Sequence, residues 1–450
     1  MDHEFDFADF SDDEIEDDLA GEQVGSEAES HEDESNLQPM EESPSDSDAE
    51  EEEGEESLDT TAAQHRQGKD IQGIPWERMH FTRERYRETR LQQYKNYENL
   101  DVAHEELEKV CQPVTSGAKL FDFQYNARGV KSTVVHFQLR NLVWANSKHD
   151  IYVMHHFAIN HWSPLQNKVT QVINLSGQSW QDQLSGIPTG GMERVQISTM
   201  CVSKNLLVAG GFHGEMVCKN LETPTVSYSG RITHADNAIT NAIEVTDSPS
   251  GAVRMLTSNN DCIVRVFDGA SFAILSRFSF PWAVNHTSVS PDGKLVCVVG
   301  DDPEGLIADF QTGKPVASLR GHLDFSFATA WHPDGRVFAT GNQDTTTRLW
   351  DVRNLKESVK VLKGRIGAIR SLRFSGDGRH LAMVEPADFV HVFETGRDYG
   401  RCQEIDLFGE IAGVSFSPDG EALFVGVSDR TYSSLLEYSR IRRERCAEYF

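Results

Sequence analysis

Apolar and polar residues alternate along most of the chain after residue 115, in short runs that are separated by turn signals. Stretches such as TSVSPDGKLVCVV, ATAWHPDGRVFAT, LRFSGDGRHLAMV and VSFSPDGEALFVG place an apolar run on each side of an Asp-Gly turn. Glycine accepts a positive φ at little steric cost, and apolar runs around a tight turn are typical of β-hairpins. The pattern therefore predicts an all-β fold that is built from hairpins.

The hairpins recur at a fixed period. Their turn glycines lie 42 or 43 residues apart, at positions 251, 293, 335, 378 and 420. This spacing is typical of four-stranded propeller blades. Two earlier stretches, 133–159 and 193–221, read as further units and bring the total to seven. We therefore expect a closed seven-bladed β-propeller over residues 115–442, fastened by pairing of AKLFDFQYNA with SSLLEYSR, because closure removes exposed sheet edges.

The composition before the repeats is strongly acidic. Residues 1–60 hold 27 of the 71 acidic residues and no Lys or Arg, so they carry nearly all of the net charge of −29. Such a stretch buries too little apolar surface to offset the entropy of ordering its backbone. We expect residues 1–66 to form a disordered acidic tail. Within it, Ser11, Ser45 and Ser47 stand among acidic residues, resemble casein kinase 2 sites, and are phosphorylation candidates.

Between the tail and the repeats, residues 67–114 are expected to form a short helical linker. Residues 75–110 are rich in Arg, Glu, Leu and Gln, contain no Gly, and have their only Pro at the start, which favours one or two helices. The expected helices carry an apolar stripe that consists of Tyr86, Leu91, Tyr94 and Tyr97. This stripe would pack on the outer wall of the propeller or bind a partner. Residues 443–450 are expected to form a C-terminal tail. The basic run RIRRER at 440–445 is solvated, serves as a signal for nuclear import, or contacts phosphates.

The sequence contains no motif of a catalytic site, and we expect no enzyme activity. Seven cysteines occur singly, without a Cys-x-x-Cys pair, and we expect a reduced intracellular protein of the nucleus, the cytoplasm or both. No apolar run approaches the ~20 residues of a membrane span, so no membrane association is expected. The histidines at 155, 156 and 161 would alternate between strand faces, so we expect neither a metal nor another cofactor. Nucleic acid is an unlikely partner, because the acidic tail repels phosphates.

The unit from Arg320 to Asn354 resembles a repeat of the WD-repeat family. It contains Gly-His at 321–322 and Trp-Asp at 350–351, and the blocks NNDCIVRVFD and EPADFVHVFE resemble a plant and fungal group of WD-repeat proteins. The resemblance implies a buried hydrogen-bonded tetrad that consists of His322, Thr340, Asp344 and Trp350. Other units depart from the pattern, with Phe at 267 and 393 in place of Trp and Arg at 365 in place of His. We expect these units to be held by core packing.

The stretch FATGNQDTTTRLWDVR, residues 338–353, resembles the WDxR box of WD-repeat substrate receptors of cullin 4 RING ubiquitin ligases. The resemblance implies that Asp351 and Arg353 bind the propeller adaptor of such a ligase. Trp-Asp-x-Arg also ends strands in WD repeats that bind no ligase, and Arg353 could pair with a nearby carboxylate instead. Three functions remain, all of them based on binding proteins: a general scaffold, a ligase substrate receptor, and an acidic chaperone that binds histones or ribosomal proteins through its tail.

Overall fold

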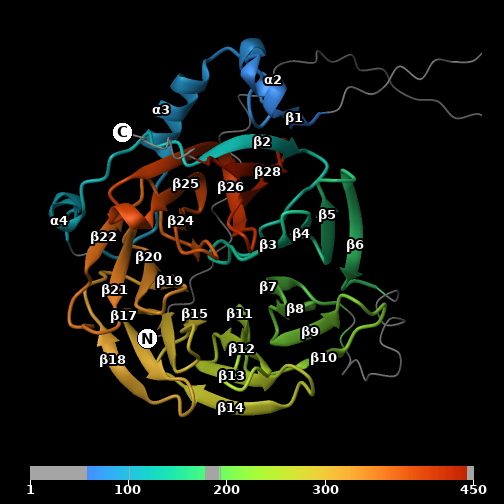
Figure 1. Ribbon diagram of the computed structural model, residues 1–450, viewed down its shortest axis with the longest axis vertical. Coiled ribbons are helices and arrows are strands. Elements are labelled where there is room, and N and C mark those ends of the chain that lie inside the picture. The colour runs from blue at the N-terminus through green and yellow to red at the C-terminus, as the bar shows by residue number, and fades with distance from the viewer. Residues whose placement is uncertain (1–57, 101, 178–191, 193, 443–450) are drawn as a thin grey trace, which may run out of the picture. The chain divides into compact units, whose positions relative to one another are not determined.

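The computed structural model describes residues 58–100, 102–177, 192 and 194–442, and β-strands dominate them (Figure 1). Five antiparallel four-stranded sheets follow one another in the chain. Their strands are β3 (Val143–Ser147), β4 (Asp150–His155), β5 (Ala158–Ser163), β6 (Lys168–Asn174); β7 (Ile197–Ser203), β8 (Leu206–Gly211), β9 (Glu215–Asn220), β10 (Tyr228–Arg231); β11 (Thr240–Asp247), β12 (Val253–Asn259), β13 (Ile263–Asp268), β14 (Ile274–Ser279); β15 (Val284–Val289), β16 (Leu295–Gly300), β17 (Asp302–Asp309), β18 (Pro315–Leu319); β19 (Ser326–Trp331), β20 (Val337–Asn342), β21 (Thr346–Asp351) and β22 (Lys360–Lys363).

A sixth sheet has eight strands and joins the two ends of the described chain. In spatial order its strands are β1 (Thr60–Thr61), β2 (Phe121–Ala127), β28 (Ser434–Arg440), β27 (Ala422–Ser428), β26 (Cys402–Phe416), β25 (Ala387–Glu394), β24 (His380–Val384) and β23 (Ser371–Phe374). The inner strands contact one another in the order β3, β7, β11, β15, β19, β23 and β26, and β26 contacts β3 in turn. The sheets therefore form a closed ring (Figure 1).

The predicted hairpins are confirmed. The pairs β15–β16, β19–β20, β23–β24 and β26–β27 are antiparallel, and the glycines in their turns have φ values between 68° and 71°. Space also restricts Gly378, because a Cβ atom there would lie 2.6 Å from His332 Nε2. The turns thus require glycine for the conformational reason that the sequence suggested.

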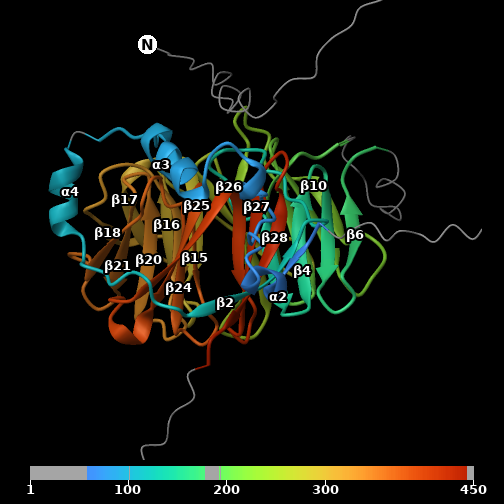
Figure 2. The ribbon, with the colours of Figure 1, turned by 90° about the horizontal axis from the view of Figure 1, so that it is seen from above.

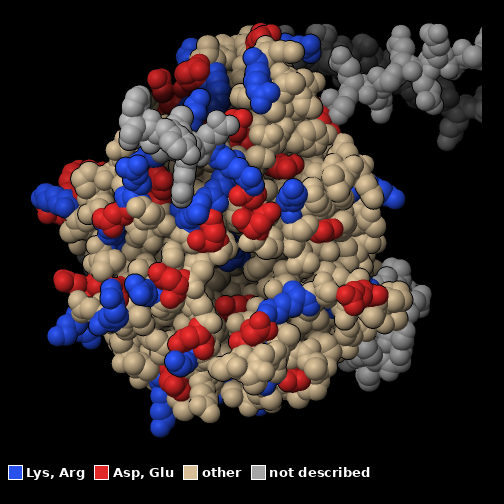
Figure 3. Space-filling model, in the orientation of Figure 1, with Lys and Arg blue, Asp and Glu red and all other residues tan. Residues whose placement is uncertain are grey.

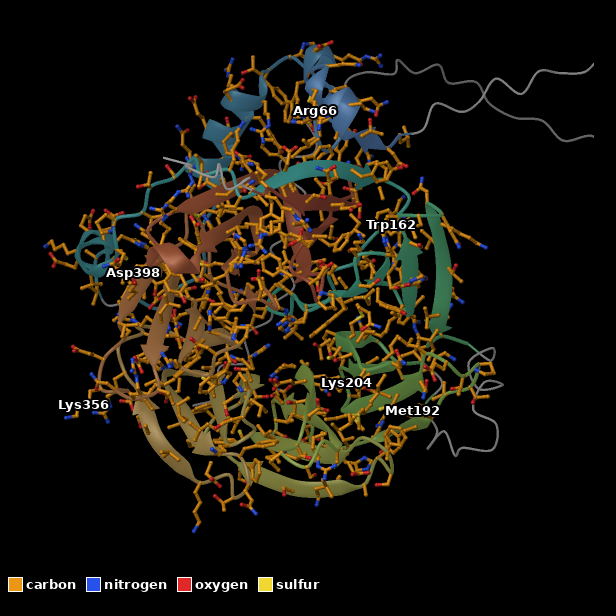
Figure 4. The ribbon with its side chains drawn as sticks, viewed as in Figure 1. Arg66, Trp162, Met192, Lys204, Lys356 and Asp398 are labelled. Atoms are coloured by element: carbon orange, nitrogen blue, oxygen red, sulfur yellow. The ribbon has the colours of Figure 1, made fainter. Side chains whose placement is uncertain are left out.

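The predicted fastening of the ring is also confirmed. Strand β2 pairs antiparallel with β28, from Phe121 opposite Arg440 to Ala127 opposite Leu435. Side chains fill the spaces between neighbouring sheets (Figure 4). Trp162, for example, is buried in an apolar cluster with Val143 and Phe424, which joins the β3–β6 sheet to the eight-stranded sheet. The first repeat begins later than residue 133, because β3 begins at Val143 and the preceding residues connect β2 to it.

The expectation that the acidic tail extends to residue 66 is wrong for residues 58–66. Strand β1 pairs with β2, and α2 (Ala62–Arg66) begins with a capping box between Thr61 and Gln64. The Asp59 carboxylate accepts hydrogen bonds from the Arg128 backbone N–H, at 2.7 Å, and from the Tyr125 hydroxyl. A strand edge is available here because β2 ends the ring's sheet, and sequence composition does not reveal such an edge. Residues 1–57, with Ser11, Ser45 and Ser47, and residues 443–450 lie outside the described residues.

The linker contains the expected helices. They are η1 (Trp76–Arg78), α3 (Arg83–Gln93) and α4 (His104–Val110), and a further short helix, η3 (Thr395–Arg397), follows β25. Figure 2 shows α3 along one face of the ring and α4 at its side. From α4 the chain follows the outer strands until it enters β2, since the backbone N–H groups of Gln112 and Ala118 donate to the carbonyls of Val361 and Cys402.

No helix in the described ranges is long and apolar enough to cross a membrane.

We predict that a chain beginning at residue 58 melts about 3–6 °C above one beginning at residue 67. The shorter chain lacks β1 and the Asp59 carboxylate, whose hydrogen bonds each contribute roughly 1 kcal/mol. Differential scanning calorimetry of the two chains measures the difference. Equal melting temperatures would show that β1 adds nothing to the stability of the ring.

Candidate interaction site

A chain of buried hydrogen bonds crosses the β19–β22 sheet. The Trp350 indole N–H donates to Thr340 Oγ1 at 2.9 Å, and this hydroxyl lies 2.8 Å from His322 Nε2. The other ring nitrogen, His322 Nδ1, lies 3.1 Å from Asp344 Oδ2. Burial alone would raise the pKa of Asp344, but the neighbouring His322 and the hydrogen bonds hold it below its usual value. The structure thus brings the four predicted tetrad side chains together, and each satisfies a polar group that would be costly alone.

The β11–β14 sheet shows what happens without the tryptophan. Phe267 takes the corresponding place, and its side chain has no N–H group to donate. The buried Thr257 hydroxyl therefore has no hydrogen-bond partner among the described residues. Asp261 instead forms an ion pair with Arg265. The strands are held by an apolar cluster that includes Phe267 and Met255. Core packing replaces the tetrad here.

The β23–β26 region uses a substitute that the sequence did not suggest. Glu385 accepts hydrogen bonds from the backbone N–H groups of residues 365–367 and lies 2.6 Å from His391 Nε2. Burial would lower the pKa of His391, but hydrogen bonds to Cys402 and Glu385 and the charge of Glu385 raise it to about 10. A buried ion pair therefore holds the loop before β23. Only the Glu and His of VEPADFVHVF, six residues apart around a turn, could have suggested it.

Asp351 and Arg353 stand where β21 ends at the surface. The guanidinium of Arg353 binds Asp351 through two nitrogens, with Nε 2.9 Å from Oδ1 and Nη2 2.5 Å from Oδ2. These hydrogen bonds lower the pKa of Asp351 to about 2. The Arg353 side chain is 71% exposed, whereas that of Asp351 is 18% exposed. The two predicted partner-binding residues therefore form one exposed, oriented ion pair.

Helix α3 is attached to the ring mainly by arginines, which the sequence analysis did not single out. Arg87 is buried and bonds to Asp388 Oδ2 and Asp406 Oδ1, each at 2.7 Å. Arg83 bonds to Asp406 and Arg90 to Asp388. The three arginines are four and three residues apart, which places them on one helix face. This spacing is the signal that could have revealed the contact.

The expected apolar stripe is divided between the ring and the solvent. Tyr86 packs against Phe408, with ring centroids 5.2 Å apart, and Tyr94 is largely buried, which raises its pKa to about 12. Tyr97 is 65% exposed, and Leu91 is partly buried. The sequence left two alternatives for the helical linker, packing on the propeller or binding a partner. Helix α3 packs on the propeller, although charged side chains make its closest contacts.

The remaining candidate clusters form contacts within the chain. The rings of His155 and His156 lie 4.2 Å apart, and His161 is 2.9 Å from Asp150. No group of three His, Cys, Asp or Glu side chains within the described ranges is arranged to hold a metal ion. In the basic run, Arg440 pairs with Asp377 and Arg442 with Glu421, while residues 443–445 lie outside the described residues.

Residues 313–351 match the sequence model of the family described as "WD domain, G-beta repeat". The chain contains a WD40 repeat domain. It is 26% identical over 197 residues to an uncharacterized protein of Schizosaccharomyces pombe, covering 39% of this chain and 57% of that protein. It is 25% identical over 256 residues to pre-mRNA-processing factor 19 homolog 2 of Arabidopsis thaliana, covering 55% of this chain and 47% of that protein. The chain thus spans about half the length of the curated relatives that it matches.

A solved structure gives the same fold. The chain in the "Crystal Structure of Mitotic Checkpoint Complex" is similar with a TM-score of 0.56 at 14% identity, over 74% of this chain and 94% of that chain. At this identity the likeness shows the fold alone, which is an all-β WD40 propeller-like arrangement with few helices. WD40 propeller proteins are typically non-enzymatic scaffolds that bind other proteins.

We predict that Trp350→Ala lowers the free energy of unfolding by about 3–5 kcal/mol, because it removes a buried indole and leaves Thr340 without its donor. Trp350→Phe should cost less, about 1–2 kcal/mol, since Phe267 shows that a phenyl ring fits the equivalent place. Denaturant unfolding measures both values. Unchanged unfolding of Trp350→Ala would mean that the hydrogen-bond chain is not structural.

We predict that Arg87→Ala lowers the free energy of unfolding by about 2–4 kcal/mol. The change leaves Asp388, which is fully buried, with Arg90 as its remaining ion-pair partner. Arg85→Ala, an exposed position on the same helix, is the control. Limited proteolysis should cut residues 83–100 faster in Arg87→Ala than in the control. Equal rates would show that the arginine contacts do not attach α3.

Proposed function

We propose that the protein is a non-enzymatic interaction scaffold on a seven-bladed propeller. The eight-stranded sheet supports this blade count, because β26 first pairs with β25 and then continues as the partner of β27. One strand can thus serve as the outer strand of one blade and the inner strand of the next. Together with the five four-stranded sheets, these two blades make seven, and β1 is an addition to the outer edge of the last.

We further infer that the WDxR box is the docking site for the propeller adaptor of a cullin 4 ligase, so that the scaffold acts as a substrate receptor. The observation that carries this proposal is the exposed Arg353 guanidinium, which Asp351 holds in a fixed orientation. The adjacent Val352 N–H donates to the Arg336 carbonyl at 2.9 Å, which ties this strand end to a hairpin turn. The Nη1 group of Arg353 is left to donate to a partner's acceptor.

The linker helices do not add to this proposal. Some such receptors resemble this chain in having an N-terminal helix pair, but here α3 is attached to the ring by Arg87 and Arg90. In helix α4, Leu107 is buried and Glu108 forms an ion pair with Lys363 of the ring. The receptor proposal therefore depends on Arg353.

The alternative is an acidic chaperone for histones or ribosomal proteins. It is favoured by the charge of residues 1–60, which hold 27 acidic residues and no basic one. Phosphorylation of Ser11, Ser45 and Ser47 would add to this charge. Both functions place the protein in the nucleus, the cytoplasm or both. Binding of purified histones by the full chain, lost in a chain that begins at residue 58, would favour the chaperone.

We predict that Arg353→Ala abolishes co-purification of the adaptor without changing the melting temperature, because the side chain is exposed and contributes little to folding. Arg379→Ala is the matched control, since the Arg379 side chain is also 71% exposed and lies in a hairpin turn. The proposal fails if the wild-type protein does not retain the adaptor or if Arg353→Ala retains it as well as Arg379→Ala does.

A further inference from the structure

Arg370 stands out at the inner side of the ring, immediately before β23. Its side chain is almost fully buried, and its guanidinium carbon lies 3.9 Å from the centre of the Phe327 ring. The side chain makes no hydrogen bond or ion pair with the described residues, and its Nε and Nη1 are buried without a partner. Such a charge is costly in a protein interior unless it is paired.

The surroundings make the unpaired charge more unfavourable. Burial and the nearby charge of Arg140 together lower the pKa of Arg370 to about 9. Arg140 is itself buried, and its contacts with Glu410 are long, at 3.3 and 3.4 Å. The Arg140 Nε also has no partner among the described residues. Two guanidinium groups thus lie near each other, and Glu410 is paired with only one of them, Arg140.

The carboxylates around Arg370 are already occupied. Asp324 accepts the backbone N–H groups of Asn99, at 2.8 Å, and of Phe325, at 2.7 Å. Glu385 accepts three backbone N–H groups and contacts His391. Glu410 contacts Arg140. None of these described carboxylates hydrogen-bonds to Arg370, and the nearby charge of Asp324 only partly offsets the effect of its burial.

An accessible aromatic surface borders the two arginines. Phe137 is 46% exposed, and its ring centre lies 5.8 Å from the Arg370 guanidinium. The neighbouring His136 stacks on Phe137 with ring centroids 5.0 Å apart, and its pKa is lowered to about 4 by burial and by the charges of Arg370 and Arg140. An anion beside these groups would offset the part of this lowering that comes from the charges of the two arginines. Figure 3 shows that the centre of the ring is hollowed, with charged side chains around the hollow.

We propose that Arg370 and Arg140 form a binding site for one compact oxyanion, a phosphate or a carboxylate group, at the centre of the ring. A planar guanidinium can bind such a group through two parallel hydrogen bonds, either from Nε and Nη2 or from Nη1 and Nη2, and each of these pairs includes one unpaired nitrogen of Arg370. The site is separate from the WDxR box and does not depend on the proposed ligase function. The oxyanion is either free or carried on an acidic peptide, and the following experiment distinguishes the two.

The test uses the full chain and two probes, inorganic phosphate and a peptide with the sequence DAEEEEGEE of residues 48–56. Each is added at constant ionic strength, with chloride as the reference. We expect at least one probe to raise the melting temperature by about 2 °C or more and to shift the His136 ring signals in NMR spectra at constant pH. A response to phosphate but not to the peptide identifies a free anion. A response to the peptide at lower concentration identifies an acidic segment.

Arg370→Met supplies the decisive comparison, because it removes the charge and keeps an apolar side chain of similar length against Phe327. We expect this variant to lose both responses and to melt at or above the wild-type temperature without a probe, since it no longer buries an unpaired charge. Arg370→Lys keeps a charge without the planar fork and should respond more weakly. Arg379→Met, at an exposed position, should respond as the wild type does.

Two results would overturn the proposal. One is the absence of a response of the wild-type protein to both probes. The other is an equal response of the wild type and Arg370→Met. If Arg370→Met does not fold, the comparison of Arg370→Lys with Arg379→Met decides, and equal responses of these two variants would then exclude the site.

Discussion

Antiparallel pairing of β2 with β28 is the interaction on which the rest of the molecule depends. Each sheet of a propeller keeps only a short outer edge, and the last sheet of this ring is completed by a strand from the other end of the chain. Here that strand is Phe121–Ala127, more than 300 residues before its partner. The pairing fixes the position of everything between residue 58 and residue 120. Strand β1 extends the same sheet, and the linker has to follow the outer strands to reach β2.

This constraint explains why α3 lies on the ring and is attached by charged groups. The segment that contains α3 is held before the helix by β1 and after it by the contact of Gln112 with Val361, so the helix stays close to the ring. Proximity alone leaves the charges of the Asp388 and Asp406 carboxylates to be neutralised. Arg87 and its neighbours on the same helix face do this, and the rigid guanidinium suits a buried carboxylate better than an ammonium group would.

Much of the ring could be predicted from the sequence, because its strands and turns follow local rules. The alternation of apolar residues and the turn glycines depend on neighbouring residues, and the hairpins agree with them. The β2–β28 pairing joins distant residues, but it follows from the 42-residue period, because a repeat of this kind closes into a ring. The Trp350 chain of hydrogen bonds was suggested by its family pattern. Other features depend on residues far apart in the chain, such as Arg87 with Asp388 and Asp59 with Arg128. No local pattern determines which carboxylate meets which arginine, so these contacts and the folded residues 58–66 were missed.

The charges of Arg353 and Arg370 contribute differently to the free energy of folding. This difference decides what each side chain can do. Arg353 is paired with Asp351 at the surface, where the pair costs little and contributes little, so evolution can tune it for a partner without changing the fold. Arg370 is buried without a partner, so its charge works against folding unless something binds it. A hydrophobic residue at 370 would pack against Phe327 without that cost. A charged group at such a position therefore suits the binding of a ligand better than it suits the stability of the ring.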